Sequence, residues 1–349
     1  MFFFTVSLKP SEKLNPFNPP PTPSPSHQRI PHVLAKPKRP RQRQALANTS
    51  FKNKLYKTSS EMVEPVLKWA GGKRSLIPHI LRLLPPDYKQ RIYHEPFFGG
   101  GALFFTLRPT RGSINDINPR LINFYKVVRD DPEGLIKTAM KYRYEKETFY
   151  KLREHYNRAS LSPIEDAALT LYLNKTAFNG LYRVNSKGEF NVPFGRYTNP
   201  TIVDKDRIRA ASRQLQNIEI MQKDFSYIVE KAEEGSICYF DPPYLPVSDT
   251  ANFTSYARDG FTWTDQVRLR DACIKLHEKG VYFVLSNSYV EKLIDFYRDE
   301  GDFSIHVVQA NRAINSKAAS RGPVKEALIT NIPAGMSGGV KTLGHFIEN

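Results

Sequence analysis

The chain contains little cysteine and no long apolar segment. Its two cysteines, Cys238 and Cys273, follow no metal-ligand spacing, which predicts buried thiols in a reducing compartment and no metal site. No stretch approaches the roughly 18 apolar residues of a membrane span. The apolar run at residues 2–6 is too short for the core of a signal peptide. We therefore expect a cytoplasmic protein without membrane contact, and no obligate protein partner is indicated.

Acidic residues are scarce in the first 60 residues, where 11 lysines and arginines face one acid. This net charge of +10 leaves only +6 of the total +16 for the rest of the chain. The remainder is thus mildly basic, which is compatible with a nucleic-acid partner without proving one. The same stretch holds ten of the 26 prolines, a composition that buries too little apolar surface to fold.

We therefore predict that residues 1–61 form a disordered, basic, proline-rich tail. Three origins compete for this segment: a tail that adds nonspecific DNA affinity, an organelle transit peptide, or translation assigned from too early a start. We favour the third, because Met62 stands immediately before the first sequence motif.

From residue 62 onward, short apolar runs alternate with helical patterns. Five runs are predicted strands, several of them apolar on both faces, as in a buried parallel sheet: residues 91–94, 113–116, 218–221, 236–240 and 281–285. Residues 264–279 form a predicted helix that ends at Gly280. Together these features predict an α/β, doubly wound core. The interval 121–216 is helical to about residue 178 and then polar to about residue 200, which indicates an inserted module.

The first of three motifs is Leu67-Lys68-Trp69-Ala70-Gly71-Gly72-Lys73. Its glycines let backbone amides and the lysine ammonium approach an anionic group, and its indole offers a flat apolar surface. A helix-initiating loop with a core tryptophan would have the same composition. A nucleotide P-loop is excluded, since that pattern needs glycines separated by four residues and a serine or threonine where this chain has Arg74.

The second motif is His94-Glu95-Pro96-Phe97-Phe98-Gly99-Gly100-Gly101, after a predicted strand. Glycines at a strand–helix turn allow a cofactor to come close to the backbone. Asp116, at the end of the next predicted strand, is placed to accept hydrogen bonds from ribose hydroxyls. The glycines are consecutive and do not form the G-x-G-x-x-G pattern of nicotinamide enzymes. A plain tight turn is the alternative interpretation.

The third motif, Asp241-Pro242-Pro243-Tyr244, is the most specific. An amine on an aromatic ring is a poor nucleophile because its lone pair is delocalised into the ring. A carboxylate and the Pro242 carbonyl, accepting its two N–H bonds, would free that lone pair to attack a methyl sulfonium. The two prolines stiffen the loop and Tyr244 can stack on the base. A Pro-Pro turn that caps a buried strand is the structural alternative.

In this order, the three motifs resemble those of the Dam-type (D12 class) DNA adenine-N6 methyltransferases. The resemblance covers residues 63–332, including the segments 174–197 and 325–331. It implies S-adenosyl-L-methionine as cofactor and double-stranded DNA as partner. It also implies a Rossmann-like methyltransferase sheet from residues 62–120 and 217–335. A mainly helical target-recognition domain with a hairpin is then inserted at 121–216, and a tail follows at 336–349.

The resemblance also implies roles for individual residues. Those implied to be catalytic are Asp241, Pro242, Pro243 and Tyr244. Those implied to bind the cofactor are Trp69, Lys73, Glu95, Phe97, Gly99, Asp116, Asp224, Phe225 and Asp241, with Phe225 where the family often packs the adenine of the cofactor. Those implied to face DNA are Asn179, Leu181, Arg183, Pro193 and Arg196. Arginine is well shaped to bind guanine through two hydrogen bonds, so Arg183 is our candidate for that role, with a phosphate contact as the alternative.

The implied reaction is methylation of an adenine that is extruded from duplex DNA, with GATC as the expected site. Many Dam-type sequences have a tyrosine at the position of Phe178, so a site related to GATC stays open. Two rival functions also remain. One is methylation of RNA adenine or of a protein amide, against which the leading Asp241 and the hairpin-like segment 178–197 argue. The other is a DNA-binding relative without catalysis, against which the intact catalytic motif argues.

Overall fold

The structure is a computed structural model that describes residues 63–69, 71, 73–244, 261–298, 302–311 and 323–337. All of these residues belong to one compact unit, residues 58–349. The predicted disorder of residues 1–61, the start proposed at Met62 and residues 338–349 of the expected C-terminal tail lie outside the described residues. Ala70 and Gly72 of the first motif lie outside them as well.

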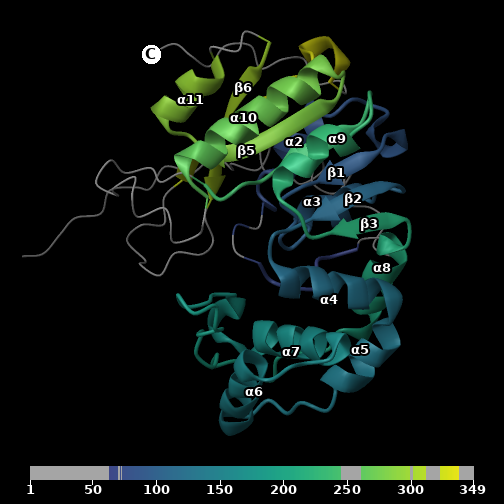
Figure 1. Ribbon diagram of the computed structural model, residues 1–349, viewed down its shortest axis with the longest axis vertical. Coiled ribbons are helices and arrows are strands. Elements are labelled where there is room, and N and C mark those ends of the chain that lie inside the picture. Colours follow the sequence, from purple (N-terminus) through teal and green to yellow (C-terminus); the bar gives the residue numbers. More distant parts are fainter. Residues whose placement is uncertain are drawn as a thin grey trace, which may run out of the picture. The chain divides into compact units, whose positions relative to one another are not determined.

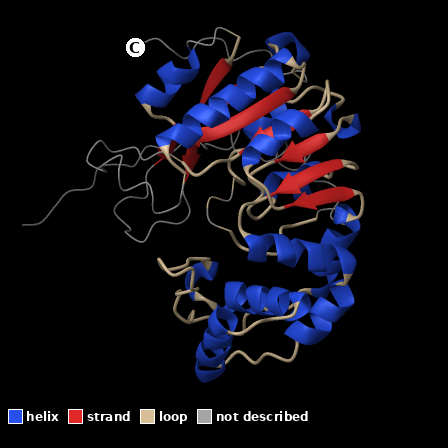
Figure 2. Ribbon diagram, in the orientation of Figure 1, coloured by secondary structure: helices blue, strands red, loops and turns tan. Residues whose placement is uncertain are grey.

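A seven-stranded mixed sheet with the order β3-β2-β1-β4-β5-β7-β6 is the centre of this unit (Figures 1 and 2). The strands β1 to β5 pair in parallel, whereas β7 is antiparallel to both β5 and β6. Their bounds are β1 Tyr93–Glu95, β2 Gly112–Asn115, β3 Ile218–Met221, β4 Ile237–Phe240, β5 Tyr282–Ser288, β6 Ser304–Asn311 and β7 Pro323–Thr330. The five predicted strands and the mostly parallel α/β sheet are confirmed.

Strand β4 explains why helices cover both faces of the sheet. Successive side chains of a strand point to opposite faces. Ile237 and Tyr239 join one apolar core, while Cys238 and Phe240 join another. Helices contribute to the first core from α2 (Ile77–Leu83), α3 (Ala102–Leu107), α4 (Pro119–Asp130) and α8 (Lys205–Leu215). The second core contains side chains of α9 (Ile228–Lys231), α10 (Trp263–Glu278) and α11 (Glu291–Arg298).

Local signals in the sequence fix the ends of two of these helices. The Asn118 side chain caps α4 by accepting the Arg120 and Leu121 amides at 3.0 and 3.2 Å. A capping box between Thr262 and Asp265 starts α10. Gly280 follows α10 with a φ of +72°, so the predicted helix with a glycine stop is confirmed. Both cysteines are buried as predicted.

Helices α4 to α7 form a helical layer next to the β3 edge of the sheet (Figure 1). They include α5 (Pro132–Ala139), α6 (Lys146–Arg158) and α7 (Pro163–Thr176). Helix α7 is buried nearly all round, because α4, α5 and α6 all pack against it. The apolar core of the sheet continues into α4, α5 and α7, and α4 spans the boundary that we expected between residues 120 and 121.

The chain folds back as a hairpin after α7. Antiparallel bridges join Ala177 to Phe194 and Val184 to Phe190, and the short helical turn η2 (Phe178–Gly180) opens the segment. We call residues 177–197 the hairpin. It shares an apolar cluster with α6 and α7, so the hairpin predicted from the sequence is confirmed. None of the helices that the structure describes combines the length and the apolar character that a membrane crossing requires.

Candidate active site

Three neighbouring parallel strands bring the sequence motifs to one edge of the sheet. Strand β1 lies between β2 and β4, and parallel strands end at the same edge. The second motif leaves the end of β1, Asp116 directly follows β2, and Asp241 directly follows β4. This carboxyl edge is where open α/β sheets bind their ligands.

Asp241 and Lys73 form the centre of the site. The Lys73 Nζ lies 3.0 Å from Asp241 Oδ1, and it also donates to the Gly71 carbonyl at 2.7 Å. The same ammonium lies 4.1 Å from the centroid of the Tyr244 ring. The Asp241 side chain remains 20% exposed, so a substrate group can reach it. The first and third motifs are therefore parts of one site.

Ser286 on β5 orients the Asp241 carboxylate from below. Its hydroxyl donates to Asp241 Oδ1 at 2.9 Å, and the Tyr239 hydroxyl lies 3.0 Å from the same serine oxygen. Burial raises the pKa of Asp241, while the Lys73 ammonium and the hydrogen bonds from Lys73 and Ser286 oppose that rise. The partners thus hold the carboxylate in one orientation and favour its ionised form.

Glu326 on β7 anchors the hydroxyl end of Tyr244. The phenol donates to Glu326 Oε2 at 3.1 Å, and Glu326 is only 5% exposed. Burial raises the pKa of Tyr244 well above its usual value, and the nearby charge of Asp241 adds to the rise. The phenol therefore stays a neutral donor, with its ring facing Lys73 and its hydroxyl tied to β7.

Glu95 is fully buried behind the site. It is 2% exposed and accepts a hydrogen bond from the Tyr93 hydroxyl at 2.7 Å. Burial raises its pKa well above the usual value, and the charge of Asp241 raises it further. This residue therefore shapes the electrostatic surroundings of Asp241 from within the protein.

The glycine turn after β1 joins Trp69 to Asp116. The Gly99 and Asn118 amides donate to the two oxygens of Asp116, each at 2.9 Å. Gly99 has a φ of +51°, and a Cβ there would lie 2.9 Å from Trp69 Cδ1, so only glycine fits under the indole. Burial raises the pKa of Asp116, and the amide hydrogen bonds oppose this rise.

An aromatic cluster flanks this turn. The rings of Phe97 and Phe225 stack with their centroids 5.3 Å apart, and Phe261 lies 5.6 Å from Phe97. The Arg268 guanidinium lies 4.9 Å from the Phe225 ring and donates to Asp224 Oδ1 at 2.6 Å. The protein itself thus engages the Asp224 carboxylate, and the aromatic rings offer the flat apolar surface that suits a purine.

These residues fit an adenosyl sulfonium cofactor. Asp116 can accept hydrogen bonds from a ribose, and the Phe97 cluster suits an adenine. Asp241, Glu95 and Glu326 surround a single ammonium, so the site has an excess of carboxyl groups that favours a cation. Among the described residues, no group of three or more metal-binding side chains could hold a metal ion.

The hairpin displays the residues that we expect to face DNA. Asn179, Arg183, Pro193 and Arg196 are exposed, whereas Leu181 is half-buried in the apolar cluster of the hairpin. The Arg183 Nε donates to the Asn191 side chain at 2.7 Å across the hairpin. That bond holds the guanidinium in a defined orientation.

Sequence reasoning missed four residues that complete the arrangement. Ser286 and Glu326 touch Asp241 and Tyr244. Asn174 binds the backbone of Lys68, and Tyr182 stacks on Trp69 with ring centroids 4.9 Å apart. The segments 174–197 and 325–331 belong to the family resemblance, but their contacts with the motifs depend on strand pairing and helix packing that the sequence does not display.

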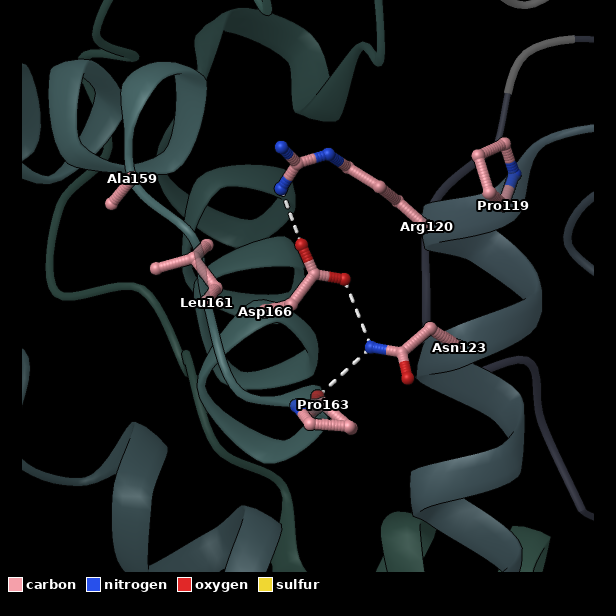
Figure 3. A pocket seen from close by; sticks show the side chains of 7 residues that line it. All are labelled: Pro119, Arg120, Asn123, Ala159, Leu161, Pro163 and Asp166. Carbon is pink, nitrogen blue, oxygen red and sulfur yellow. Dashed lines mark hydrogen bonds and ion pairs between the residues drawn. The ribbon is translucent and has the colours of Figure 1, made fainter.

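A second hollow, of about 300 Å³, lies between α4 and the loop before α7 (Figure 3). Its polar groups bind one another, since Arg120 and Asn123 both donate to the Asp166 carboxylate. Asn123 also donates to the Pro163 carbonyl at 2.8 Å. These contacts join two helices and give the hollow a structural role. Its lining residues are Pro119, Arg120, Asn123, Ala159, Leu161, Pro163 and Asp166.

Comparison with known proteins agrees with this geometry. Residues 69–314 match the model of the D12 class N6 adenine-specific DNA methyltransferase family. The chain is 46% identical to the type II methyltransferase M1.LlaDCHI of Lactococcus lactis subsp. cremoris over 276 residues, which are 77% of this chain and 95% of the relative. It is 41% identical to the type II methyltransferase M.MjaIII of Methanocaldococcus jannaschii, over 77% of this chain and 99% of that relative.

A third relative is the DNA adenine methylase of Escherichia coli strain K12. The chain is 35% identical to it over 275 residues, which are 78% of this chain and 96% of the relative. The family match and the relatives therefore cover the sheet, the helical layer and the hairpin together. The chain belongs to the D12 class of N6 adenine-specific DNA methyltransferases.

Proposed function

We propose that the chain methylates the N6 amine of adenine at GATC sites in duplex DNA, using S-adenosyl-L-methionine and extruding the target base from the helix. The observation that carries this proposal is the 3.0 Å ion pair between Asp241 and Lys73, with the Tyr244 ring facing the same ammonium. An adenine stacked on Tyr244 would present its amine to Asp241. Extrusion is needed because that amine is otherwise engaged in a base pair.

The residues of the chain supply orientation and not a strong base. Asp241 accepts one N–H of the amine through Oδ2, while Lys73 and Ser286 engage Oδ1. The Pro242 carbonyl accepts the other N–H, so the nitrogen lone pair is released from the ring and directed outward. The cofactor, when bound, supplies an electrophilic methyl group on a sulfonium. The new N–C bond forms as the S–C bond breaks, and the electrons of that bond stay on sulfur. The cationic amine then loses a proton to Asp241 or water.

The substitution Asp241→Ala tests the catalytic assignment. We expect methyl transfer from labelled cofactor to fall at least about 100-fold, because the group that orients the amine is gone, while duplex affinity stays within a few-fold. Asp271→Ala is the matched control, since Asp271 is an exposed acid on α10 that pairs with Arg270 at 3.5 Å. Unchanged turnover in Asp241→Ala would remove Asp241 from the reaction.

The target is tested by expressing the full chain in cells that lack adenine methylation and mapping modified bases by long-read sequencing. We expect methylated adenine at GATC. Methylation of adenine at another sequence would retain the chemistry and replace the site. Methyl groups found on RNA or on protein amides, with unmodified DNA, would replace the substrate.

A further inference from the structure

Asn174 ties the first motif to the hairpin. It lies in the last turn of α7 and is 1% exposed. Its Oδ1 accepts the Lys68 amide at 2.9 Å, and its Nδ2 donates to the Lys68 and Gly180 carbonyls at 2.7 and 3.2 Å. The two N–H groups of this side chain are thus both used and its oxygen accepts a third bond. One buried amide therefore holds Lys68, next to Trp69, and Gly180, at the start of the hairpin.

Gly180 brings the hairpin backbone directly against Lys68. Its φ of +65° favours glycine, and a Cβ there would lie only 2.5 Å from Lys68 Cδ and 3.1 Å from Lys68 Cβ. A larger residue would push the hairpin away from the first motif. The close approach is thus a property of the sequence and not of a loose surface contact.

Tyr182 makes a second connection through Trp69. The two rings stack with centroids 4.9 Å apart and an angle of 23° between their planes. The same indole lies on the glycine turn, where a Cβ at Gly99 would be 2.9 Å from Trp69 Cδ1. The Gly99 amide in turn donates to Asp116. A continuous chain of contacts therefore runs from the hairpin to the residue that we expect to bind the cofactor ribose.

We propose that Asn174 and Tyr182 are positioning residues that hold the cofactor-binding motif against the hairpin, so that cofactor and duplex DNA each bind more tightly in the presence of the other. This inference rests on the proposed function, which assigns the cofactor to the Trp69–Asp116 side and DNA to the hairpin. A ligand that orders one end of a packed contact lowers the cost of ordering the other end. The two effects are equal by linkage and are usually roughly five- to 150-fold.

The test measures this coupling in the full chain. S-adenosylhomocysteine serves as the cofactor probe, because it has no methyl group to transfer. Its Kd is measured by calorimetry with and without a short duplex that contains the site identified by methylation mapping. The reciprocal Kd of the duplex is measured with and without S-adenosylhomocysteine. We expect a coupling ratio of roughly five or more in the unmodified chain.

Two substitutions should bring this ratio close to one. Asn174→Asp keeps the shape of the side chain but removes both N–H donors, and Tyr182→Leu removes the ring that stacks on Trp69. Tyr182→Phe keeps the stack and should retain the coupling. A role limited to general stability would weaken both ligands and leave their ratio unchanged, so the ratio separates the two explanations.

Asn157→Asp is the matched control for the amide. Asn157 on α6 binds the Phe190 backbone in the same manner, with its amide donating at 3.0 Å and its oxygen accepting at 2.8 Å. This bond holds the far part of the hairpin, so its loss should lower thermal stability and keep the coupling ratio. Equal loss of coupling in Asn157→Asp and Asn174→Asp would overturn the proposal, as would an unchanged ratio in Asn174→Asp and Tyr182→Leu.

A ratio of one in the unmodified chain would also overturn the proposal. Methyl transfer by the unmodified chain separates this failure from that of the proposed function. If transfer to the duplex is intact but coupling is absent, only the positioning role of Asn174 and Tyr182 falls. If the chain transfers no methyl group to DNA, the proposed function itself falls.

Discussion

At the scale of single residues, burial gives several ionisable groups their chemical character. His94 on β1 is 2% exposed, and its Nδ1 lies 2.8 Å from the Ser113 hydroxyl. Burial lowers the pKa of His94 to about 4, and the positive charge of Lys231 lowers it further. The native protein therefore contains a neutral imidazole directly before the second motif at neutral pH.

This histidine should make the fold sensitive to acid. Below pH 6.5 the unfolded chain takes up a proton at this position, whereas the native protein does so only near pH 4. The free energy of unfolding should therefore fall as the pH drops from about 6.5 to 4, by up to about 3 kcal/mol from this group alone. His94→Asn should remove that part of the loss, measured by urea unfolding at several pH values across this range.

The control is the same substitution at an exposed histidine. His155 lies on α6, 3.0 Å from Glu165, and its side chain is 46% exposed. We expect His155→Asn to lose stability in acid as the unmodified chain does. If His94→Asn also keeps the full acid loss, the native state does not hold His94 neutral through this pH range.

At the scale of elements, the sequence predicted the strands well and their partners incompletely. Asp241, Asp116 and the Gly99 turn could be placed together from sequence, because each follows an apolar run and parallel strands end at one edge. Ser286 and Glu326 could not be placed, since their approach to the site depends on β7 inserting antiparallel between β5 and β6. Nothing in the local pattern of residues 325–330 sets that order.

The link between Asn174 and Lys68 escaped prediction for a related reason. The two residues are 106 positions apart, and Asn174 lies on a helix that is buried nearly all round. A polar residue on such a helix shows no amphipathic stripe that would mark its direction. Its function depends on how α7 packs among α4, α5 and α6.

The hairpin is the element on which sequence choice should depend. Arg183 is exposed and oriented by its bond to Asn191. If it binds guanine through two hydrogen bonds, Arg183→Ala should reduce discrimination between the mapped site and a duplex with that guanine replaced, by roughly 1–3 kcal/mol. Competition methylation assays with the two duplexes measure this difference.

Lys187→Ala is the matched control on the same hairpin. Lys187 is exposed in the turn between Asn185 and Gly188, so its loss should weaken binding to both duplexes alike. If Arg183→Ala behaves in the same manner as Lys187→Ala, Arg183 contacts phosphate and the guanine is bound by another residue.

At the scale of the whole molecule, positive charge is concentrated away from the catalytic unit. Of the formal charge of +16, residues 1–60 contribute +10. Affinity for the DNA backbone rises with the number of phosphates neutralised and falls with salt, whereas site choice depends on contacts with bases. The two properties should therefore separate along the chain, with backbone affinity enhanced by the first 60 residues and site choice located in the hairpin.

A chain that begins at Met62 tests this division, because it lacks 11 lysines and arginines but only two acids, Glu12 and Glu61. We expect weaker binding to nonspecific duplex and a logarithmic salt dependence that is less steep by about one for each phosphate that the shorter chain no longer neutralises. The methylated sequence should not change. Replacing the five basic residues of the segment 36–43 with glutamine keeps the length and should reproduce part of the effect. An unchanged salt slope would show that the first 61 residues neutralise no phosphates, and an altered methylated sequence would locate part of site recognition there.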